Sequence, residues 1–308
     1  MDSPSSTAVA SPRGRFALPV LSLSPGVLLS LAAVYLIWSS TYLALRFMVA
    51  DLPPLLTSGL RYLLAGLLLY TFLRVRGAAA PTRRQWLLSA ITGNLMFFVG
   101  NGFVAIAARE VPSGVTAMAV ASMPLFLAAM EALLGQRPTR LQGLGLGLGM
   151  LGVVWMNAGE LSVTPGAGVL LMLAPVGWAT GSLLVRRVAL PTGPMAAAAQ
   201  MIAGGTVMGL YGYGAGERIV AMPSTSSLLA VVYLVIFGSI VGFSACMHLL
   251  RNTSASLATS YAYVNPVLAV ALGALVAGER VQPAVLLAGA LVVAGVAVLL
   301  TSAARPKP

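Results

Sequence analysis

The sequence predicts an all-α, polytopic membrane protein with about ten transmembrane helices, built as two inverted five-helix repeats. Three observations predict it: a low content of charge, a series of apolar runs of membrane-spanning length, and a second half that repeats the first. Of the 308 residues, 58% are hydrophobic and only 8% are charged, whereas a soluble globular domain carries roughly 25% charged residues. A chain so poor in charge cannot cover a water-facing surface, which favours a bilayer environment.

The net charge of +11 raises the alternative of a nucleic-acid-binding protein. The basic residues do not form one patch with interleaved aromatic residues. They lie in the short breaks between apolar runs, where they orient a membrane protein, so no nucleic-acid partner is expected. The single cysteine, Cys246, and the single histidine, His248, exclude an intrachain disulfide and argue against a bound catalytic metal. No cofactor is expected.

Ten apolar runs have the length of a membrane span. A hydrocarbon core about 30 Å thick is crossed by roughly 20 helical residues, and only a helix satisfies its own backbone hydrogen bonds there. The runs lie at residues 27–47, 55–73, 86–108, 112–135, 140–157, 166–186, 195–214, 228–250, 254–277 and 283–301. Residues 1–26 predict a disordered cytoplasmic tail, and residues 302–308 predict a second cytoplasmic tail.

The basic residues predict that both termini are cytoplasmic. With the N-terminus inside, 13 of the 18 Lys and Arg residues fall on the inner side, three fall on the outer side, and Arg46 and Arg61 lie within helices. This asymmetry follows the positive-inside rule.

The second half of the chain repeats features of the first half in the same order. The segment WSSTYLALR at 38–46 matches WATGSLLVR at 178–186. Further matches keep nearly the same offset along the chain: RYLLAG at 61–66 with QMIAGG at 200–205, Arg109 with Arg251, Pro124 with Pro266, and GQR at 135–137 with GER at 278–280. Because a unit of five spans places the next copy upside down, the pattern predicts a first repeat over 27–157 and an inverted second repeat over 166–301.

The chain resembles EamA-domain permeases of the drug/metabolite transporter superfamily. The resemblance rests on WSSTYLALR, on TSGLRYLLAG in the second span and on SASLATSYAYVNPVLAVALGALVAGER across the ninth, and it covers residues 27 to 301. It implies a multi-pass protein of the bacterial inner (plasma) membrane that exports amino acids or other metabolites. Gln136 stands where the family pattern, kept at Glu279, has glutamate, so the two positions do not form a pair of glutamates.

An inverted repeat predicts a binding site near the membrane midplane, between the two halves. With a rise of 1.5 Å per residue, Tyr263 lies roughly 14 Å along its helix, and Trp38 and Trp178 lie roughly 16–18 Å along theirs. Together with Tyr261 and Asn265, these side chains predict a pocket for an organic solute. The alternative is that they fill the core and bond to neighbouring backbone groups.

Two further pairs of residues are candidates for this site. Asn94 and Asn101 lie seven residues apart on the third span and either face the same cavity or join neighbouring helices. Pro124 and Pro266 occupy matching positions in the fourth and ninth spans, and each frees a backbone carbonyl about one turn earlier. They are interpreted either as hinges or as plain kinks.

Charged side chains inside a membrane are costly and functional by default. Arg61 is expected roughly 9 Å inside the outer end of the second span, where it either attracts a substrate carboxylate or extends to the surface. Glu131 and His248 fall at one depth near the inner face and either exchange a proton or are simply solvated. Arg46 is interpreted as an exposed ion pair with Asp51.

Glycines in the fifth span predict the close approach of another helix. They occupy positions 143, 145, 147 and 149. The approaching helix belongs either to the same chain or to a second subunit of a homodimer, and both alternatives stay open.

The favoured function is a secondary transporter that exports small amphipathic metabolites or amino acids by alternating access at the midplane pocket. Its expected partners are a small-molecule substrate and the lipid bilayer, and import is the first alternative. A membrane-embedded enzyme would require a nucleophile–base pair, a carboxylate dyad or a metal cluster at depth, and a sensor would require long loops or an output domain. The sequence favours neither, and it lacks the Gly-x-x-x-x-Gly-Lys-Ser/Thr motif of nucleotide hydrolysis.

Overall fold

The computed structural model describes residues 24–135, 138–158, 164–253, 255–258, 260–280 and 282–303, and these residues form helices and connections without a strand. The elements, with α for α-helices and η for π-helices, are α1 (Pro25–Asp51), α2 (Pro54–Val75), α3 (Arg83–Gly93), η2 (Asn94–Gly102), α4 (Phe103–Ala107), α5 (Ser113–Val120), α6 (Met123–Leu133), α7 (Arg140–Ala158), α8 (Pro165–Val185), α9 (Pro194–Gly214), α10 (Thr225–Tyr233), η3 (Leu234–Val241), α11 (Gly242–Asn252), α12 (Ala255–Ala258), α13 (Tyr261–Ala277) and α14 (Pro283–Ala303). Most of the two predicted tails, together with Gln136, lies outside the described residues.

Six described helices, or runs of consecutive helices, are long and apolar enough to cross a membrane. They are Pro25–Asp51, Pro54–Val75, Arg83–Ala107, Ser113–Leu133, Pro165–Val185 and Thr225–Cys246, and shorter apolar helices span Val264–Ala277 and Leu286–Val298. Every apolar run predicted from the sequence falls on a helix or on consecutive helices. An all-helical polytopic membrane protein is therefore confirmed, and the count of ten crossings stays a prediction.

Capping residues fix where α1 and α8 begin. Ser24 accepts a hydrogen bond from the backbone N–H of Val27 at the start of α1, and Thr164 accepts one from Ala167 at the start of α8. A proline follows each cap, at a position where its missing N–H costs nothing. The starts of α1, α2 and η2 at residues 25, 54 and 94 are matched, at one constant offset, by those of α8, α9 and η3 at residues 165, 194 and 234.

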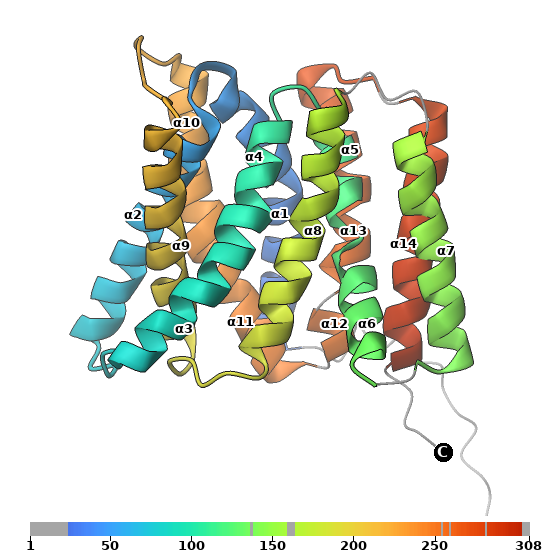
Figure 1. The fold of residues 1–308 in the computed structure, drawn as a ribbon, viewed down its shortest axis with the longest axis horizontal. Helices are drawn as coiled ribbons and strands as arrows, with labels where there is room; N and C mark the ends of the chain where they lie inside the picture. The colour runs from blue at the N-terminus through green and yellow to red at the C-terminus, as the bar shows by residue number, and fades with distance from the viewer. Residues whose placement is uncertain are drawn as a thin grey trace, which may run out of the picture.

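The helices stand side by side between two ends (Figure 1). We call the end at which α1 ends and α2 begins the upper end, and the end at which α1 begins and α14 ends the lower end. Thr164, which opens α8, donates a hydrogen bond to Glu110 in the connection between α4 and α5. This connection also lies at the upper end, so α8 runs in the direction opposite to α1.

Two helix pairs pack so closely that only glycine fits between them. A Cβ atom on Gly59 of α2 would lie 2.3 Å from the backbone nitrogen of Gly209 in α9, and one on Gly295 of α14 would lie 2.5 Å from the Cα of Gly149 in α7. Small residues permit this approach between membrane helices. The helix that approaches Gly149 thus belongs to the same chain. Gly143 and Gly147 have no described atom within 4 Å of an added Cβ, and a second subunit at that face stays a prediction.

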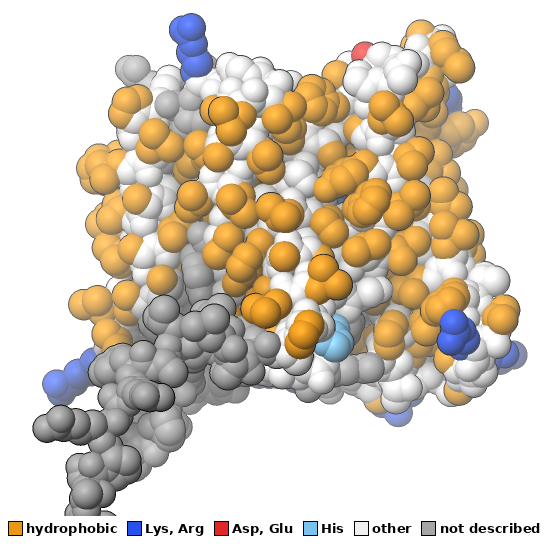
Figure 2. Space-filling model, turned by 180° about the vertical axis from the view of Figure 1, so that it is seen from behind, with side chains coloured by type: hydrophobic (Ala, Val, Ile, Leu, Met, Phe, Trp, Pro, Cys, Tyr) orange, Lys and Arg blue, Asp and Glu red, His pale blue; other side chains and the backbone are white. Residues whose placement is uncertain are grey.

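The surface of the bundle is apolar between its two ends. Figure 2 shows hydrophobic side chains spread over the middle of one face, with Lys and Arg side chains near the upper and lower edges. Leu36, Leu144 and Leu210 are each more than half exposed. Lipid tails are as apolar as leucine, so such a surface is stable in contact with a bilayer and unfavourable in contact with water.

The lower half of α1 packs against α11, α12 and the start of α13. The buried members of this cluster are Val27, Leu31, Val34, Cys246, Leu249 and Ala258, and the partly buried Trp38 and Tyr261 pack onto it. The hydroxyl groups of Tyr35 and Ser260 share a hydrogen bond of 2.5 Å at the same level. This packing closes the interior of the bundle toward the lower end.

Candidate functional site

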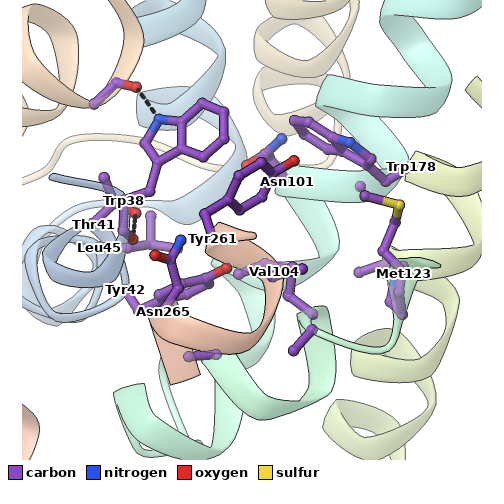
Figure 3. A pocket seen from close by; sticks show the side chains of 18 of the residues that line it. Trp38, Thr41, Tyr42, Leu45, Asn101, Val104, Met123, Trp178, Tyr261 and Asn265 are labelled. Atoms are coloured by element: carbon purple, nitrogen blue, oxygen red, sulfur yellow. Dashed lines mark hydrogen bonds between the residues drawn. The ribbon is translucent and has the colours of Figure 1, made fainter. Parts of the chain in front are cut away.

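A pocket of about 130 Å³ lies in the interior of the bundle, above the cluster just described. Its walls come from α1, α2, η2, α4, α5, α6, α8, η3, α11 and α13. The volume is roughly ten times the space that one water molecule requires. Figure 3 shows Trp38 and Trp178 on opposite sides of the view, with Tyr261 and Asn101 between them.

Trp38 from α1 is held by the π-helical segment η3 and the residue that follows it. Its Nε1–H donates to the carbonyl of Gly238 at 3.3 Å. A Cβ atom on Gly242 would lie 2.3 Å from Trp38 Nε1, so only glycine leaves room for the indole. Trp178 from α8 packs in the same way on η2, where a Cβ on Gly100 would lie 3.0 Å from its ring. Each tryptophan thus lies on a glycine at a π-helical segment, a type of segment often found at functional sites.

Two residues of α13 complete this side of the pocket. The ring of Tyr261 meets Trp38 edge to face, with centroids 4.8 Å apart. Asn265 is buried, and its Oδ1 lies 3.2 Å from the hydroxyl of Ser39 on α1. The backbone of Tyr263 belongs to α13, but its side chain lies outside the described part of the chain.

Arg61 does not extend to the surface. It is 8% exposed, lines the pocket, and places its guanidinium 4.0 Å from the centroid of the Tyr62 ring. Its Nε is buried without a hydrogen-bond partner among the described residues, and so is the hydroxyl of Ser58. Ser58 also lines the pocket, and its spacing of three residues from Arg61 puts both on one face of α2. Ser58 was not predicted from the sequence, although this spacing could have identified it.

Of the two predicted asparagines, Asn101 lines the pocket and Asn94 does not. Asn94 donates to the carbonyl of Ala90 at 2.8 Å, and Asn101 donates to that of Met96 at 3.1 Å. The expectation that both share one face assumed α-helical geometry. The segment between them is π-helical, with hydrogen bonds five residues apart instead of four, so the two side chains point differently.

Three prolines line the pocket. Pro266 lies inside α13, and Pro124 follows a break between α5 and α6. Pro175 lies inside α8, three residues before Trp178. Pro175 was not predicted from the sequence, although its position beside a central tryptophan was visible. A proline frees the carbonyl four residues earlier, and Val120 and Ala262, which hold that position before Pro124 and Pro266, also line the pocket.

The two residues considered for proton exchange lie outside the pocket and have different partners. Glu131 of α6 accepts a hydrogen bond from Arg186 at 2.9 Å. His248 of α11 is exposed, and its Nδ1 lies 3.4 Å from the amide of Asn252. The structure therefore does not bring Glu131 and His248 together as a pair, and a role in proton coupling stays a prediction.

The expected ion pair between Arg46 and Asp51 is wrong. Arg46 instead pairs with Glu279 at 2.5 Å, and the Glu279 side chain is only 3% exposed. Asp51 accepts hydrogen bonds from the backbone N–H of Ser224 and the hydroxyl of Ser227 at the start of α10. A carboxylate is stabilised at a helix N-terminus by the free N–H groups and the helix dipole, and this is the position that Asp51 occupies.

The two tandem parts of the chain match one known family. The sequence profile of the EamA-like transporter family matches residues 24–158 and, separately, residues 166–301. The chain belongs to the EamA-like transporter family. The resemblance to EamA-domain permeases of the drug/metabolite transporter superfamily is thereby confirmed.

This EamA-like transporter has relatives in two different bacteria. It is 44% identical over 255 residues, 82% of its length and 83% of the relative's, to the uncharacterized inner membrane transporter YedA of Escherichia coli strain K12. It is 25% identical over 286 residues, 91% and 93% of the two chains, to the uncharacterized transporter YvbV of Bacillus subtilis strain 168. A crystal structure of another protein shares the fold with a TM-score of 0.64, over 92% of this chain and 99% of that one, at 23% identity.

No group of three or more His, Cys, Asp or Glu side chains that could hold a metal ion occurs within the part of this EamA-like transporter that the structure describes. The chemical groups that the pocket does offer are one guanidinium, several hydroxyls and amides, and aromatic faces. Such a set binds a solute by charge, hydrogen bonds and stacking.

Proposed function

We propose that this membrane transporter is a secondary exporter of small amphipathic metabolites, which pass through the pocket between Trp38 and Trp178. The observation that carries the proposal is the pocket itself, which combines aromatic walls with a buried arginine in the interior of an apolar bundle. Membrane proteins seldom keep a charge at such depth without a functional reason.

Ten membrane crossings in two inverted halves form part of the proposal. The constant offset between matching helix starts and the opposite directions of α1 and α8 support it. We place the lower end in the cytoplasm, because it holds Arg74, Arg76, Arg83, Arg84, Arg140, Arg186 and Arg187. The upper end holds Arg109, Arg218 and Arg280, together with Arg46 near the end of α1. Seven described arginines at the lower end against four at the upper end follow the positive-inside rule.

Transport then proceeds by alternating access. The pocket opens first to one side of the membrane and then to the other. The solute is held by Trp38, Trp178, Tyr261 and Asn265, and by Tyr263 as predicted from the sequence. Pro124, in the first turn of α6, and Pro266, inside α13, act as hinges. Packing of Trp38 and Tyr261 onto the cluster below them supports closure toward the cytoplasm as one of the two states.

The test compares metabolites in the medium of cells that overproduce the protein with those of cells that overproduce Trp38→Ala/Arg61→Ala at equal membrane level. Trp155→Ala is the matched control, because Trp155 is exposed on the surface of α7, outside the pocket. A compound enriched with the intact protein and with the control, but not with the double variant, supports export through the pocket. Enrichment that survives the double variant would rule the pocket out as the route, and uptake of a compound from the medium would favour import.

A further inference from the structure

The pocket contains a positive charge with no balancing negative charge. Arg61 is the single charged side chain among its described lining residues. The described carboxylates lie elsewhere, and each has a partner: Asp51 with Ser224, Glu110 with Thr164, Glu131 with Arg186, Glu217 with Leu56, and Glu279 with Arg46. None of these partners is a pocket residue. No described carboxylate therefore neutralises the charge of Arg61 inside the pocket.

Arg61 also retains unused hydrogen-bonding capacity in the wall of the pocket. A guanidinium carries one positive charge and five N–H donors in a planar fork. The Tyr62 face compensates only part of the charge. The buried Nε of Arg61 and the buried hydroxyl of Ser58 lack partners among the described residues. Unsatisfied donors beside a guanidinium on one helix face are suited to an anionic group such as a carboxylate.

The remaining walls indicate what the anionic group is attached to. Trp38, Phe243, Tyr261 and Trp178 present aromatic surfaces, which suit a flat apolar body. The acceptors that could receive an ammonium group are neutral: the carbonyls freed by Pro124 and Pro266 and the amide oxygens. A cationic group in the same small pocket would also be repelled by Arg61, with little screening in a buried site.

We propose that the pocket selects organic monoanions, that is, a carboxylate on a flat apolar body, over zwitterions and cations with the same body. This proposal rests on the proposed transport function and narrows its substrate class. It distinguishes a simple carboxylic acid from an amino acid, which carries the same carboxylate together with an ammonium group.

The test uses three probes of nearly equal shape and different charge: 3-phenylpropionate, phenylalanine and phenethylamine. The full-length protein is purified in detergent in a low-salt buffer without carboxylates, with Trp86→Phe/Trp155→Phe so that tryptophan fluorescence reports Trp38 and Trp178 alone. We expect 3-phenylpropionate to bind with a dissociation constant roughly tenfold or more below that of phenylalanine, and phenethylamine to bind most weakly. Arg61→Gln should abolish this ranking, and Arg61→Lys should preserve its order.

Controls separate loss of selectivity from loss of fold. Arg186→Gln removes an arginine outside the pocket and should leave the ranking unchanged, and inaccessibility of the buried Cys246 thiol to a maleimide dye verifies folding of every variant. Equal or tighter binding of phenylalanine, an unchanged ranking in Arg61→Gln, or no response to any probe would each overturn the proposal. Sodium chloride gives a further test. If chloride displaces 3-phenylpropionate completely and the three probes bind equally well, the site binds an inorganic anion and the proposal is overturned. None of these outcomes bears on the export experiment with Trp38→Ala/Arg61→Ala. The proposed transport function is therefore tested separately from this substrate preference.

Discussion

Replacement of Glu279 by alanine is expected to loosen the upper ends of three helices at once. Glu279 lies two residues after the end of α13. Its carboxylate accepts hydrogen bonds from the backbone N–H of Ser113 at 2.9 Å and from the Ser113 hydroxyl at 2.8 Å, at the start of α5. It also pairs with Arg46 near the end of α1. The substitution removes all three contacts.

The cost of this substitution follows from the burial of each partner. Ser113 is 1% exposed, so its two donors would lose their acceptor in a dry environment, at about 1–3 kcal/mol each. Arg46 has a side chain that is 39% exposed and can turn to water, so its loss adds little. We expect a total of about 3 kcal/mol for Glu279→Ala. Glu279→Gln retains an acceptor oxygen for the Ser113 N–H and should cost about 1 kcal/mol.

The single cysteine provides the assay. Cys246 is 7% exposed, so a fluorogenic maleimide reports unfolding of the purified protein during heating. Glu279→Ala should lower the midpoint by roughly 5–10 °C, and Glu279→Gln should fall between it and the wild type. Glu110→Ala is the matched control, since Glu110 lies at the same end of the bundle and both it and its partner Thr164 are exposed. If Glu279→Ala melts together with Glu110→Ala, the buried carboxylate does not hold these helices and the reasoning fails.

Two glycine substitutions test the close contacts, each against Gly147→Ala, whose added Cβ meets open space. In Gly242→Ala the new methyl group would overlap the Trp38 indole, so the ring must move. The Trp38 emission spectrum should then shift, and export that depends on Trp38 should fall. An unchanged spectrum would refute the contact. In Gly59→Ala the new methyl group would meet the backbone of Gly209, forcing α2 away from α9 at a cost of about 3 kcal/mol, visible as earlier exposure of Cys246 on heating. Melting at the temperature of Gly147→Ala would show that α2 and α9 separate without penalty.

Hydrophobic length is a reliable guide to the helices. The run predicted at 195–214 coincides with α9 (Pro194–Gly214), and the run at 166–186 coincides with α8 (Pro165–Val185). The bilayer fixes how many apolar residues a helix needs, so a local property of the sequence is enough. Depth along these helices also places Trp38 and Trp178 at one level, and both line the pocket.

Contacts between distant parts of the chain could not be derived in the same way. The sequence favours the nearby Asp51 as the partner of Arg46, whereas the partner in the structure, Glu279, lies 233 residues away. The π-helical segments η2 and η3 carry no compositional signal that separates them from α-helix, and η2 is the reason that Asn94 misses the pocket. Such features depend on which helices pack together. The hydrophobic pattern of one helix does not specify which other helices lie beside it.

The glycine contacts of α2 and α7 have a consequence for the order in which the protein assembles during synthesis. Gly59 meets Gly209, and Gly149 meets Gly295, so each groove in the first half is filled by a helix encoded in the second half. At a synthesis rate of about 5–20 residues per second, this delay is roughly 8–30 s. We expect lipid to cover these faces of α2 and α7 during that time, until α9 and α14 insert and displace it. The packing of the first half is therefore completed only after the helices of the second half have been synthesised, and the rate of synthesis limits the rate of assembly.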